Sequence, residues 1–302
     1  MKTVQKPWIK LKETLDREDC LLIGGLEKEC LERDGTALKL ELAYKLASAA
    51  QRGPGALKTI RDLMYFDGDK LIGYLGMDCF GGCGAPPEAN GMVHPDYRGQ
   101  GVFTALHGLM AGELKRRGTP AVLLLCDRKS SAGQRFVQKA GAQKHHAEFE
   151  MYLREQPLAD RPDAGITFRR AENGDAGEIA RQNAVYFGEE EATDVLILPE
   201  EEAKRGITIY LACLGGEIIG KTHLQLDGAL GGIYGLGVLP QYRGRGLGRA
   251  VLSGSVGLLR KAGAEGIMLQ VATENERALH LYASCGFQTT STMDYYLLDL
   301  EH

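Results

Sequence analysis

Residues 242–252 read YRGRGLGRAVL, a run in which glycine alternates with charged and apolar residues. If a helix begins in this run, its first N–H groups lack intrahelical partners, and together with the helix dipole they favour an anion. The run has three glycines, which let a ligand approach the backbone closely, namely Gly244, Gly246 and Gly248. It also has three arginines suited to phosphate groups, namely Arg243, Arg245 and Arg249. The run predicts a diphosphate site, although a glycine-rich turn with surface arginines explains the loop alone equally well.

Two common phosphate-binding loops do not match this run. A P-loop requires Gly-Lys followed by Ser or Thr, and no such triplet follows. A dinucleotide-binding fingerprint read from Gly244 requires a small residue where this chain has Arg249. The loop therefore argues against kinases, ATPases and NAD-dependent enzymes.

A second group of residues lies downstream, in the run VATENERALHLYASCGF at 271–287. Asn275, Ala278 and Tyr282 follow a predicted strand at spacings that fit a helix. The phenol of Tyr282 carries a proton that could be donated to a leaving group. A tyrosine on a short amphipathic helix is more often a packing residue, so Tyr282 alone does not establish catalysis.

The glycine loop occurs twice in the chain. Residues 97–106 read YRGQGVFTAL, and a shift of 145 aligns the two halves without a gap over about fifty positions. Between the copies, residues 154–165 are charged and contain two prolines, as expected of a linker. We therefore expect two domains, residues 1–156 and 157–302.

The first copy lacks the residue types on which the chemistry depends. At the shift of 145, Gly248 becomes Phe103, Asn275 becomes Ser130 and Tyr282 becomes Val137. A phenyl ring at position 103 could crowd a diphosphate, and valine has no proton to donate. We expect residues 1–156 to be a degenerate copy that serves structure, pairing or acceptor recognition; two working sites are the alternative.

The elements that must position these residues alternate between strands and helices in the C-terminal half. A strand is expected at 166–171, followed by a helix from Asp175, whose carboxylate can cap it. Gly215–Gly216 suits a tight hairpin. The later elements expected are a strand at 231–239, a helix at 244–262, a strand at 266–272, a helix at 275–285 and a closing strand pair at 287–300. The alternation predicts an α/β domain with a mixed sheet flanked by helices. In the N-terminal half, residues 16–33 and 36–50 both read as helical.

Composition narrows the class of protein. The 302 residues are 44% hydrophobic and 25% charged, which is typical of a globular chain with two cores. The net charge of −4 gives no reason to expect nucleic acid or an anionic membrane as a partner. The N-terminus has no apolar signal segment, and the seven cysteines are an odd count that fits reduced thiols in the cytoplasm. Cys79 and Cys83 have no matching second pair, so no metal is expected.

The combination of Arg-x-x-Gly-x-Gly with Asn-x-x-Ala-x-x-x-Tyr-x-x-x-Gly-Phe resembles the GNAT family of acetyl-CoA-dependent N-acetyltransferases. The resemblance covers essentially the whole C-terminal half, and the full chain looks like a tandem GNAT protein. It implies that each domain has a mixed, mostly antiparallel sheet whose central parallel pair splays apart to hold the pantetheine arm of the cofactor. The cofactor contacts that it implies are Leu236, Gly237, Val238, Arg243, Gly244, Arg245, Gly246, Leu247, Gly248, Arg249 and Asn275.

The resemblance also implies a reaction. A neutral amine attacks the thioester of acetyl-CoA, a backbone N–H near Val238 polarises the carbonyl, and Tyr282 donates its proton to the departing sulfur. The general base stays open, because the glutamate that several relatives carry on the fifth strand is Gln270 here. A water chain, His223 or an acid in the segment 189–191 could serve instead.

The acceptor is expected to be an amine of a small molecule or peptide, and the acidic run 188–194 could hold a cationic amine or be a solvated loop. The alternative is an acetyl-CoA-binding regulatory or interaction protein without turnover. A tandem chain could act as a monomer that is its own pseudo-dimer, or as a homodimer.

Overall fold

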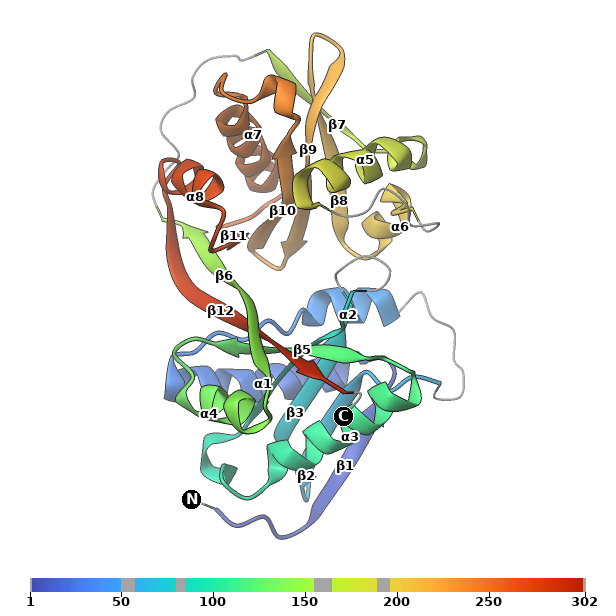
Figure 1. Ribbon diagram of the computed structural model, residues 1–302, viewed down its shortest axis with the longest axis vertical. Helices are drawn as coiled ribbons and strands as arrows, with labels where there is room; N and C mark the ends of the chain where they lie inside the picture. Colours follow the sequence, from blue (N-terminus) through green and yellow to red (C-terminus); the bar gives the residue numbers. More distant parts are fainter. Residues whose placement is uncertain (1, 50–57, 80–84, 155–164, 189–195, 301–302) are drawn as a thin grey trace. The chain divides into compact units, whose positions relative to one another are not determined.

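The structure, a computed structural model, describes residues 2–49, 58–79, 85–154, 165–188 and 196–300. The chain divides into two compact units (Figure 1). Unit 1 comprises Met1–Ala147 and Ser291–His302, and unit 2 comprises Glu148–Thr290. Each unit has a sheet with helices on both faces, so the predicted α/β class is confirmed.

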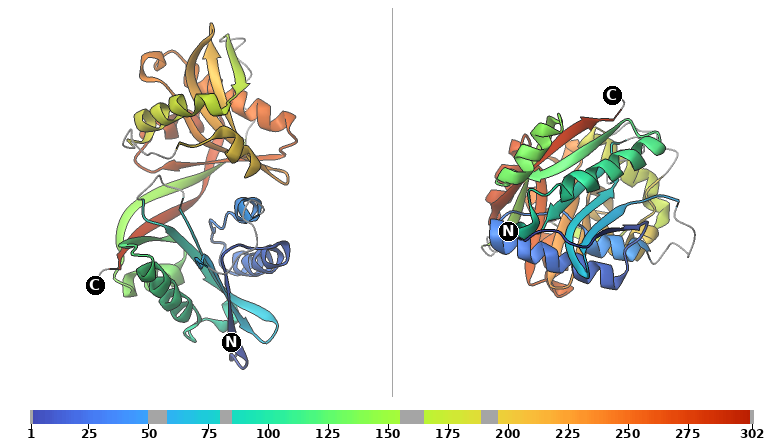
Figure 2. Two further views of the ribbon diagram at one scale, coloured as in Figure 1. Left: turned by 90° about the vertical axis from the view of Figure 1, so that its right-hand side faces the viewer. Right: turned by 90° about the horizontal axis from the view of Figure 1, so that it is seen from below.

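Unit 1 contains a sheet with the strand order β1-β2-β3-β4-β5-β12. Its elements in chain order are β1 (Pro7–Lys12), α1 (Arg17–Asp34), α2 (Leu42–Ala49), β2 (Asp62–Asp67), β3 (Lys70–Asp78), β4 (Glu88–Val93), α3 (Val102–Arg116), β5 (Ala121–Asp127) and α4 (Ser131–Lys139). Helices α1 and α2 lie on one side of this sheet, and α3 and α4 lie on the other (Figure 2). The Asp16 carboxylate caps α1 where the sequence predicts a helix start, whereas α2 begins only at Leu42.

Unit 2 contains a sheet with the strand order β6-β11-β10-β9-β8-β7. Its elements are β7 (Ile166–Arg170), α5 (Ala176–Phe187), α6 (Pro199–Lys204), β8 (Ile207–Leu214), β9 (Glu217–Asp227), β10 (Leu230–Val238), α7 (Leu247–Lys261), β11 (Gly266–Ala272) and α8 (Glu276–Ala283). Gly215 and Gly216 have φ of 59° and 89° between β8 and β9, as the predicted hairpin requires. The expected order of strands and helices is thus confirmed up to α8, except that the short helix α6 was not predicted.

Two faces of the unit 2 sheet are covered by different helices. Apolar side chains of β10 and β11, such as Ile233 and Leu269, pack with Leu252 of α7 and Tyr282 of α8 in one core cluster. On the opposite face, Ile179 of α5 packs against β8. We call these the α7 face and the α5 face.

Two strands pass from one unit to the other. β6 (Gln143–Leu153) begins in unit 1 and ends in unit 2, where its residues 148–152 pair with β11. β12 (Phe287–Asp299) begins in unit 2 and ends in unit 1, where its residues 293–299 pair with β5. The predicted closing strand pair at 287–300 is therefore wrong, because this segment is one long strand. The compact units accordingly do not follow the predicted division at 156/157.

A parallel strand pair separates in the middle of each sheet. In unit 2, β10 and β11 are paired only from Leu230↔Gly266 to Ile233↔Leu269. In unit 1, β4 and β5 are paired only at Glu88↔Leu123 and Ala89↔Leu124. Beyond these pairs the strands diverge, so the expected splayed central pair is present in both units.

The start of α5 differs from the expectation. The helix begins after Asp175, but its carboxylate does not cap it. That carboxylate accepts a hydrogen bond from the Glu172 N–H and forms an ion pair with Arg169 at 2.7 Å. Asp175 thus stabilises the turn before the helix rather than its first N–H groups.

Within the described parts of the chain, none of the helices combines the length and the apolar character that crossing a membrane requires.

Candidate functional site

The glycine loop of unit 2 connects β10 to α7. Gly244 and Gly246 have φ of 76° and 78°, a left-handed conformation that residues with a side chain rarely adopt. Gly246 is the N-cap of α7, and a glycine offers no side chain to the first N–H groups of the helix. Helix α7 therefore begins at Leu247, and the N–H groups of its first turn are available for an anion.

Gly248 is different, because its backbone does not require glycine. A Cβ added there would make an ordinary contact with Leu281 Cδ2 at 3.5 Å, and its φ lies outside the left-handed region. Nothing in the fold of the described residues explains why this helical position lacks a side chain. An open space above the first turn of α7 is what an approaching ligand needs.

The arginines of the loop have different roles. Arg243 Nε donates to the Val238 carbonyl at 2.8 Å, and its guanidinium lies over the Tyr186 ring at 5.9 Å from the centroid. Arg249 Nη2 donates to Ser284 Oγ at 2.7 Å, which ties the first turn of α7 to the end of α8. These contacts hold the loop in shape, and phosphate contacts by Arg243, Arg245 or Arg249 stay a prediction.

The backbone of β10 is irregular next to the splay. Its register with β9 shifts between Tyr234 and Gly237, so the segment around Leu236 is not part of a regular ladder on that side. On the other side, β10 has no β11 partner beyond Ile233. The Tyr186 ring lies so close to Gly237 that a Cβ there would collide with it. Backbone groups at Leu236, Gly237 and Val238 therefore border the wedge between the separating strands β10 and β11, and their contacts with a cofactor stay a prediction.

Tyr282 and Asn275 lie on α8, as predicted. Asn275 is its N-cap, and its Oδ1 accepts from the Ala278 N–H at 3.2 Å. Tyr282 is buried in the core cluster on the α7 face. Burial raises the pKa of its phenol to about 12, so it keeps its proton at neutral pH.

Polar side chains gather on the α5 face near the irregular part of β10. Lys221 is fully buried, and its Nζ lies 3.2 Å from His223 Nε2 and 3.1 Å from the Gly235 carbonyl. Its ammonium also lies 5.6 Å from the centroid of the Tyr186 ring. Burial, and then the charge of Lys221, lower the pKa of His223 well below its ordinary value. The acidic segment 189–191 lies outside the described residues.

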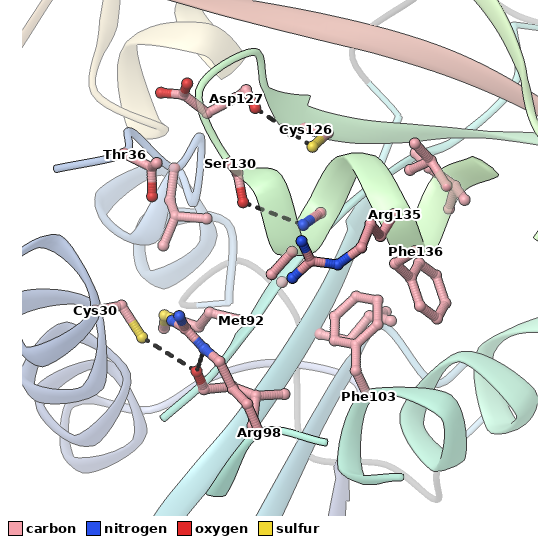
Figure 3. A pocket seen from close by; sticks show the side chains of 18 of the residues that line it. Cys30, Thr36, Met92, Arg98, Phe103, Cys126, Asp127, Ser130, Arg135 and Phe136 are labelled. Carbon is pink, nitrogen blue, oxygen red and sulfur yellow. Dashed lines mark hydrogen bonds between the residues drawn. The ribbon is translucent and has the colours of Figure 1, made fainter. Parts of the chain in front are cut away.

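Unit 1 contains a cavity of about 530 Å³ at the position that corresponds to the candidate site of unit 2 (Figure 3). Its glycine loop has the same geometry, with φ of 76° at Gly99 and 80° at Gly101. Phe103 packs edge-on against Phe136, with ring centroids 4.6 Å apart. A Cβ at Gly91 of β4 would lie 3.0 Å from the Phe103 ring, so this ring lies against the strand beside the splay.

A charge pair also distinguishes the two loops. Arg98 of unit 1 donates to the Val93 carbonyl, as Arg243 does to Val238. Unlike Arg243, it also pairs with the Asp34 carboxylate, with Nη1 3.0 Å from Oδ1. Sequence reasoning did not predict a formed cavity in the first copy. The two glycines that the loops of both units share could have indicated a cavity in unit 1. The packing of Phe103 against Phe136, which distinguishes this cavity from the site of unit 2, is visible only in the structure.

Among the described residues, no group of three or more His, Cys, Asp or Glu side chains is placed to hold a metal ion.

Sequence comparisons identify related proteins. The family model of the Acetyltransferase (GNAT) family matches residues 177–287. A mycothiol acetyltransferase of Thermobispora bispora is 28% identical over 303 residues, covering 95% of this chain and 97% of the relative. A mycothiol acetyltransferase of Actinosynnema mirum is 28% identical over 290 residues, covering 91% of this chain and 94% of the relative.

Solved structures share the fold over most of the chain. A GCN5-related N-acetyltransferase from Sphaerobacter thermophilus has a TM-score of 0.71 at 20% identity, covering 97% of this chain and 96% of its own. A tandem GNAT protein from the clavulanic acid biosynthesis pathway has a TM-score of 0.75 at 16% identity, covering 98% of this chain and 99% of its own. At these identities the likeness concerns the fold alone.

The splayed strand pair in both units, the glycine loop before α7 and these matches define the class. Residues 177–287 match the GNAT family of acetyltransferases, and the whole chain is similar to mycothiol acetyltransferases and has the fold of a tandem GNAT protein.

Proposed function

We propose that this chain is an N-acetyltransferase that transfers the acetyl group of acetyl-CoA to an amine of a small molecule or peptide, with its active site in unit 2. One observation carries the proposal: unit 2 keeps both the open first turn of α7 at Gly248 and the buried phenol of Tyr282. Unit 1 has Phe103 and Val137 at these two positions.

The residues of unit 2 suit acetyl-CoA. The N–H groups of Leu247, Gly248 and Arg249 would donate hydrogen bonds to the diphosphate at the start of α7. Backbone groups of β10 at Leu236, Gly237 and Val238 would hold the pantetheine arm in the wedge. Asn275, at the start of α8, would contact the arm from the other side of the wedge. Acetyl-CoA supplies the activated acetyl group as a thioester.

Two groups of unit 2 would act on the thioester of acetyl-CoA. A backbone N–H of the irregular β10 segment would polarise the thioester carbonyl. Tyr282 would donate a hydrogen bond to the leaving sulfur. Its pKa of about 12 lies above the value of about 8.5 for a thiol. The phenol therefore stabilises the thiolate mainly by hydrogen bonding, and full proton transfer would be uphill.

The experiment that tests this function is acetyl transfer to a panel of amines, followed by mass spectrometry of the acetylated product. The panel holds amino acids, peptide N-termini and amino sugars, and it includes the unacetylated precursor of mycothiol because of the relatives' name. Tyr282→Phe keeps the ring and removes the donor, and we expect it to lower kcat about 10²-fold. Calorimetry should show unchanged acetyl-CoA binding by this variant, and an unchanged kcat would remove Tyr282 from the chemistry.

A second function, acetyl-CoA binding without turnover, is favoured by Gln270 and by the formed cavity of unit 1. Calorimetry with acetyl-CoA separates the two views. We expect one acetyl-CoA per chain, because the Phe103 ring covers β4 in unit 1. Tight binding with no product across the whole panel would favour the regulatory function, and two molecules per chain would contradict the single-site proposal.

A further inference from the structure

The strand that passes from unit 1 into unit 2 carries a carboxylate to the candidate active site. β6 pairs antiparallel with β11, and Glu150 lies directly opposite Gln270. Opposite residues of an antiparallel pair lie on the same face, with Cβ atoms about 4.5–5.5 Å apart. The carboxylate of Glu150 therefore lies on the strand next to β11, beside the amide of Gln270.

Glu150 lies at the level where the wedge opens. The last parallel pair between β10 and β11 is Ile233↔Leu269, so Gln270 is the first β11 residue beyond it. Leu269 and its β6 partner Met151 pack in the core on the α7 face. Side chains alternate along a strand, so Gln270 and Glu150 belong to the α5 face. The buried phenol of Tyr282 is on the α7 face, so the two groups approach the wedge from opposite sides.

His223 is poorly suited to be the base. Burial and the Lys221 ammonium 3.2 Å away both disfavour a second positive charge on this face. A general base must carry the proton that it accepts, and a carboxylate becomes neutral when it does so, whereas an imidazole becomes charged. Glu150 on β6 lies three strands away from Lys221 on β9, so this ammonium weakens His223 as a base far more than it weakens Glu150.

Unit 1 serves as an internal comparison. Shifted by 145, Gln270 and Glu150 correspond to Leu125 and Tyr295, which are also opposite each other, on β5 and β12. The Tyr295 hydroxyl accepts a hydrogen bond from Lys39 Nζ at 2.8 Å. The unit that has Val137 in place of the phenolic donor therefore also has no carboxylate at this pair of positions.

We infer that Glu150, supplied to unit 2 by the strand from the first half of the chain, is the general base that deprotonates the acceptor ammonium. This inference rests on the proposed acetyltransferase function. One proton passes from the ammonium to the Glu150 carboxylate, directly or through one water. The neutral nitrogen then forms the C–N bond as the C–S bond breaks. The nitrogen then loses its second proton to the departing thiolate, directly or through a water, while Tyr282 donates a hydrogen bond to that sulfur.

The test compares Glu150→Gln with Glu148→Gln. Glu148 is on the same strand and the same face, two residues before Glu150, and lies opposite Ala272. With an amine that the wild type accepts, we expect Glu150→Gln to lower kcat by 10²–10⁴-fold at neutral pH. Glu148→Gln should stay within about threefold of the wild type. Acetyl-CoA binding by calorimetry should be the same in all three proteins.

A structural role for Glu150 would not reproduce the dependence on amine basicity. An analogue of the same amine, fluorinated beside the nitrogen, is largely unprotonated at neutral pH and needs no base for its first proton. Glu150→Gln should lose much less activity with this analogue. In the pH profile of kcat/KM for the basic amine, the variant should keep gaining activity toward alkaline pH.

The pH profile of kcat/KM also distinguishes Glu150 from the other titratable groups on the α5 face. They are Glu148, Tyr152, Tyr186, Lys221, His223 and Tyr234. Among these groups and Glu150, only the removal of the Glu150 carboxylate is expected to change the pH profile of kcat/KM in this way. The double variant Glu150→Gln with Gln270→Glu should recover at least tenfold, because the two positions are opposite each other.

The outcomes separate this inference from the proposed function. If the wild type forms no product with any amine, the proposed function fails and the inference fails with it. If the wild type is active and Glu150→Gln is equally active with the basic amine, the inference alone is overturned. Equal losses with basic and fluorinated amines would also overturn it, because they indicate that Glu150 only maintains the site.

Discussion

At the scale of single residues, the three loop glycines serve two different purposes. Gly244 and Gly246 are required by their positive φ, so the fold itself explains them. Gly248 has ordinary helical geometry, and a Cβ there would make only an ordinary contact with Leu281, so the fold does not require glycine and a bound ligand would account for it. The same distinction applies to the arginines, because Arg243 and Arg249 have clear structural partners. A motif thus mixes residues that shape a loop with residues that leave room for its ligand.

This distinction can be measured with two alanine variants. Gly246→Ala places a side chain at a φ of 78°, which should destabilise the protein by about 1–2 kcal/mol. Gly248→Ala should leave the melting temperature unchanged or raise it, because alanine favours a helix more than glycine does by up to about 1 kcal/mol.

Binding should show the reverse order. Gly248→Ala should weaken acetyl-CoA binding at least tenfold in calorimetry, because its methyl group projects into the ligand's space. Wild-type affinity in a fully stable Gly248→Ala protein would mean that the first turn of α7 is not the diphosphate site.

Residue types on the α7 side of the site could be predicted from the sequence, because they follow each other at fixed spacings within one loop and one helix. The residues on the α5 face could not. Tyr186, Lys221 and Glu150 come from three elements far apart in the chain. Their position on one face of the sheet depends on strand register and on which strand lies next to β11, and neither is encoded in a local pattern.

At the scale of elements, most boundaries followed from local signals such as caps and glycines. The predicted helix over 36–50 shortened to Leu42–Ala49, and residues 36–41 form a loop instead. The N–H group of Ala37 in this loop donates to the Asp127 carboxylate of β5 at 2.7 Å. This long-range bond draws the segment away from a helix, and local propensity gives no indication of it.

The end of α3 provides an element-scale prediction about pH. Glu113 is buried and accepts hydrogen bonds from Arg117 Nε at 2.8 Å and the Ile60 N–H at 2.9 Å. Mainly through its hydrogen bonds with Arg116, its pKa is lowered from 4.5 to about 2. The pKa is lower in the folded state, so the stabilisation is complete above 4.5 and is lost as the pH falls toward 2.

Glu113→Gln should therefore lower the free energy of unfolding at pH 7 by on the order of 2 kcal/mol, and it should flatten the acid-induced loss below pH 4.5. Urea denaturation followed by circular dichroism over this pH range measures both effects. Glu201→Gln, in the partly exposed pair with Lys204, is the control and should match the wild type. Parallel pH curves for Glu113→Gln and the wild type would contradict the assignment.

At the scale of the whole molecule, the two halves of the sequence are not two independent folding units. The repeat at a shift of 145 is a property of the sequence, whereas β6 and β12 each extend from one compact unit into the other. The linker composition indicated a boundary near 157, and that boundary separates Glu150 from the rest of unit 2. A repeat cannot reveal strand exchange, because exchanged and unexchanged strands have the same local sequence.

The exchange predicts how fragments behave. Residues 1–156 lack β12, whose Tyr295 and Met293 are buried against β5. This fragment should therefore fail to unfold cooperatively in denaturant. Residues 1–147 joined through a flexible linker to residues 287–302 regain that strand and should unfold cooperatively. A stable, cooperative fragment 1–156 would show that β5 does not need the C-terminal strand.

The central claim is that the amides at the start of α7 bind the diphosphate of coenzyme A. A crystal structure of the full chain with coenzyme A tests it most directly. We predict phosphate oxygens within hydrogen-bonding distance, about 2.7–3.2 Å, of the N–H groups of residues 247–249. A coenzyme A molecule found only in the cavity of unit 1, with the start of α7 unoccupied, would contradict the claim.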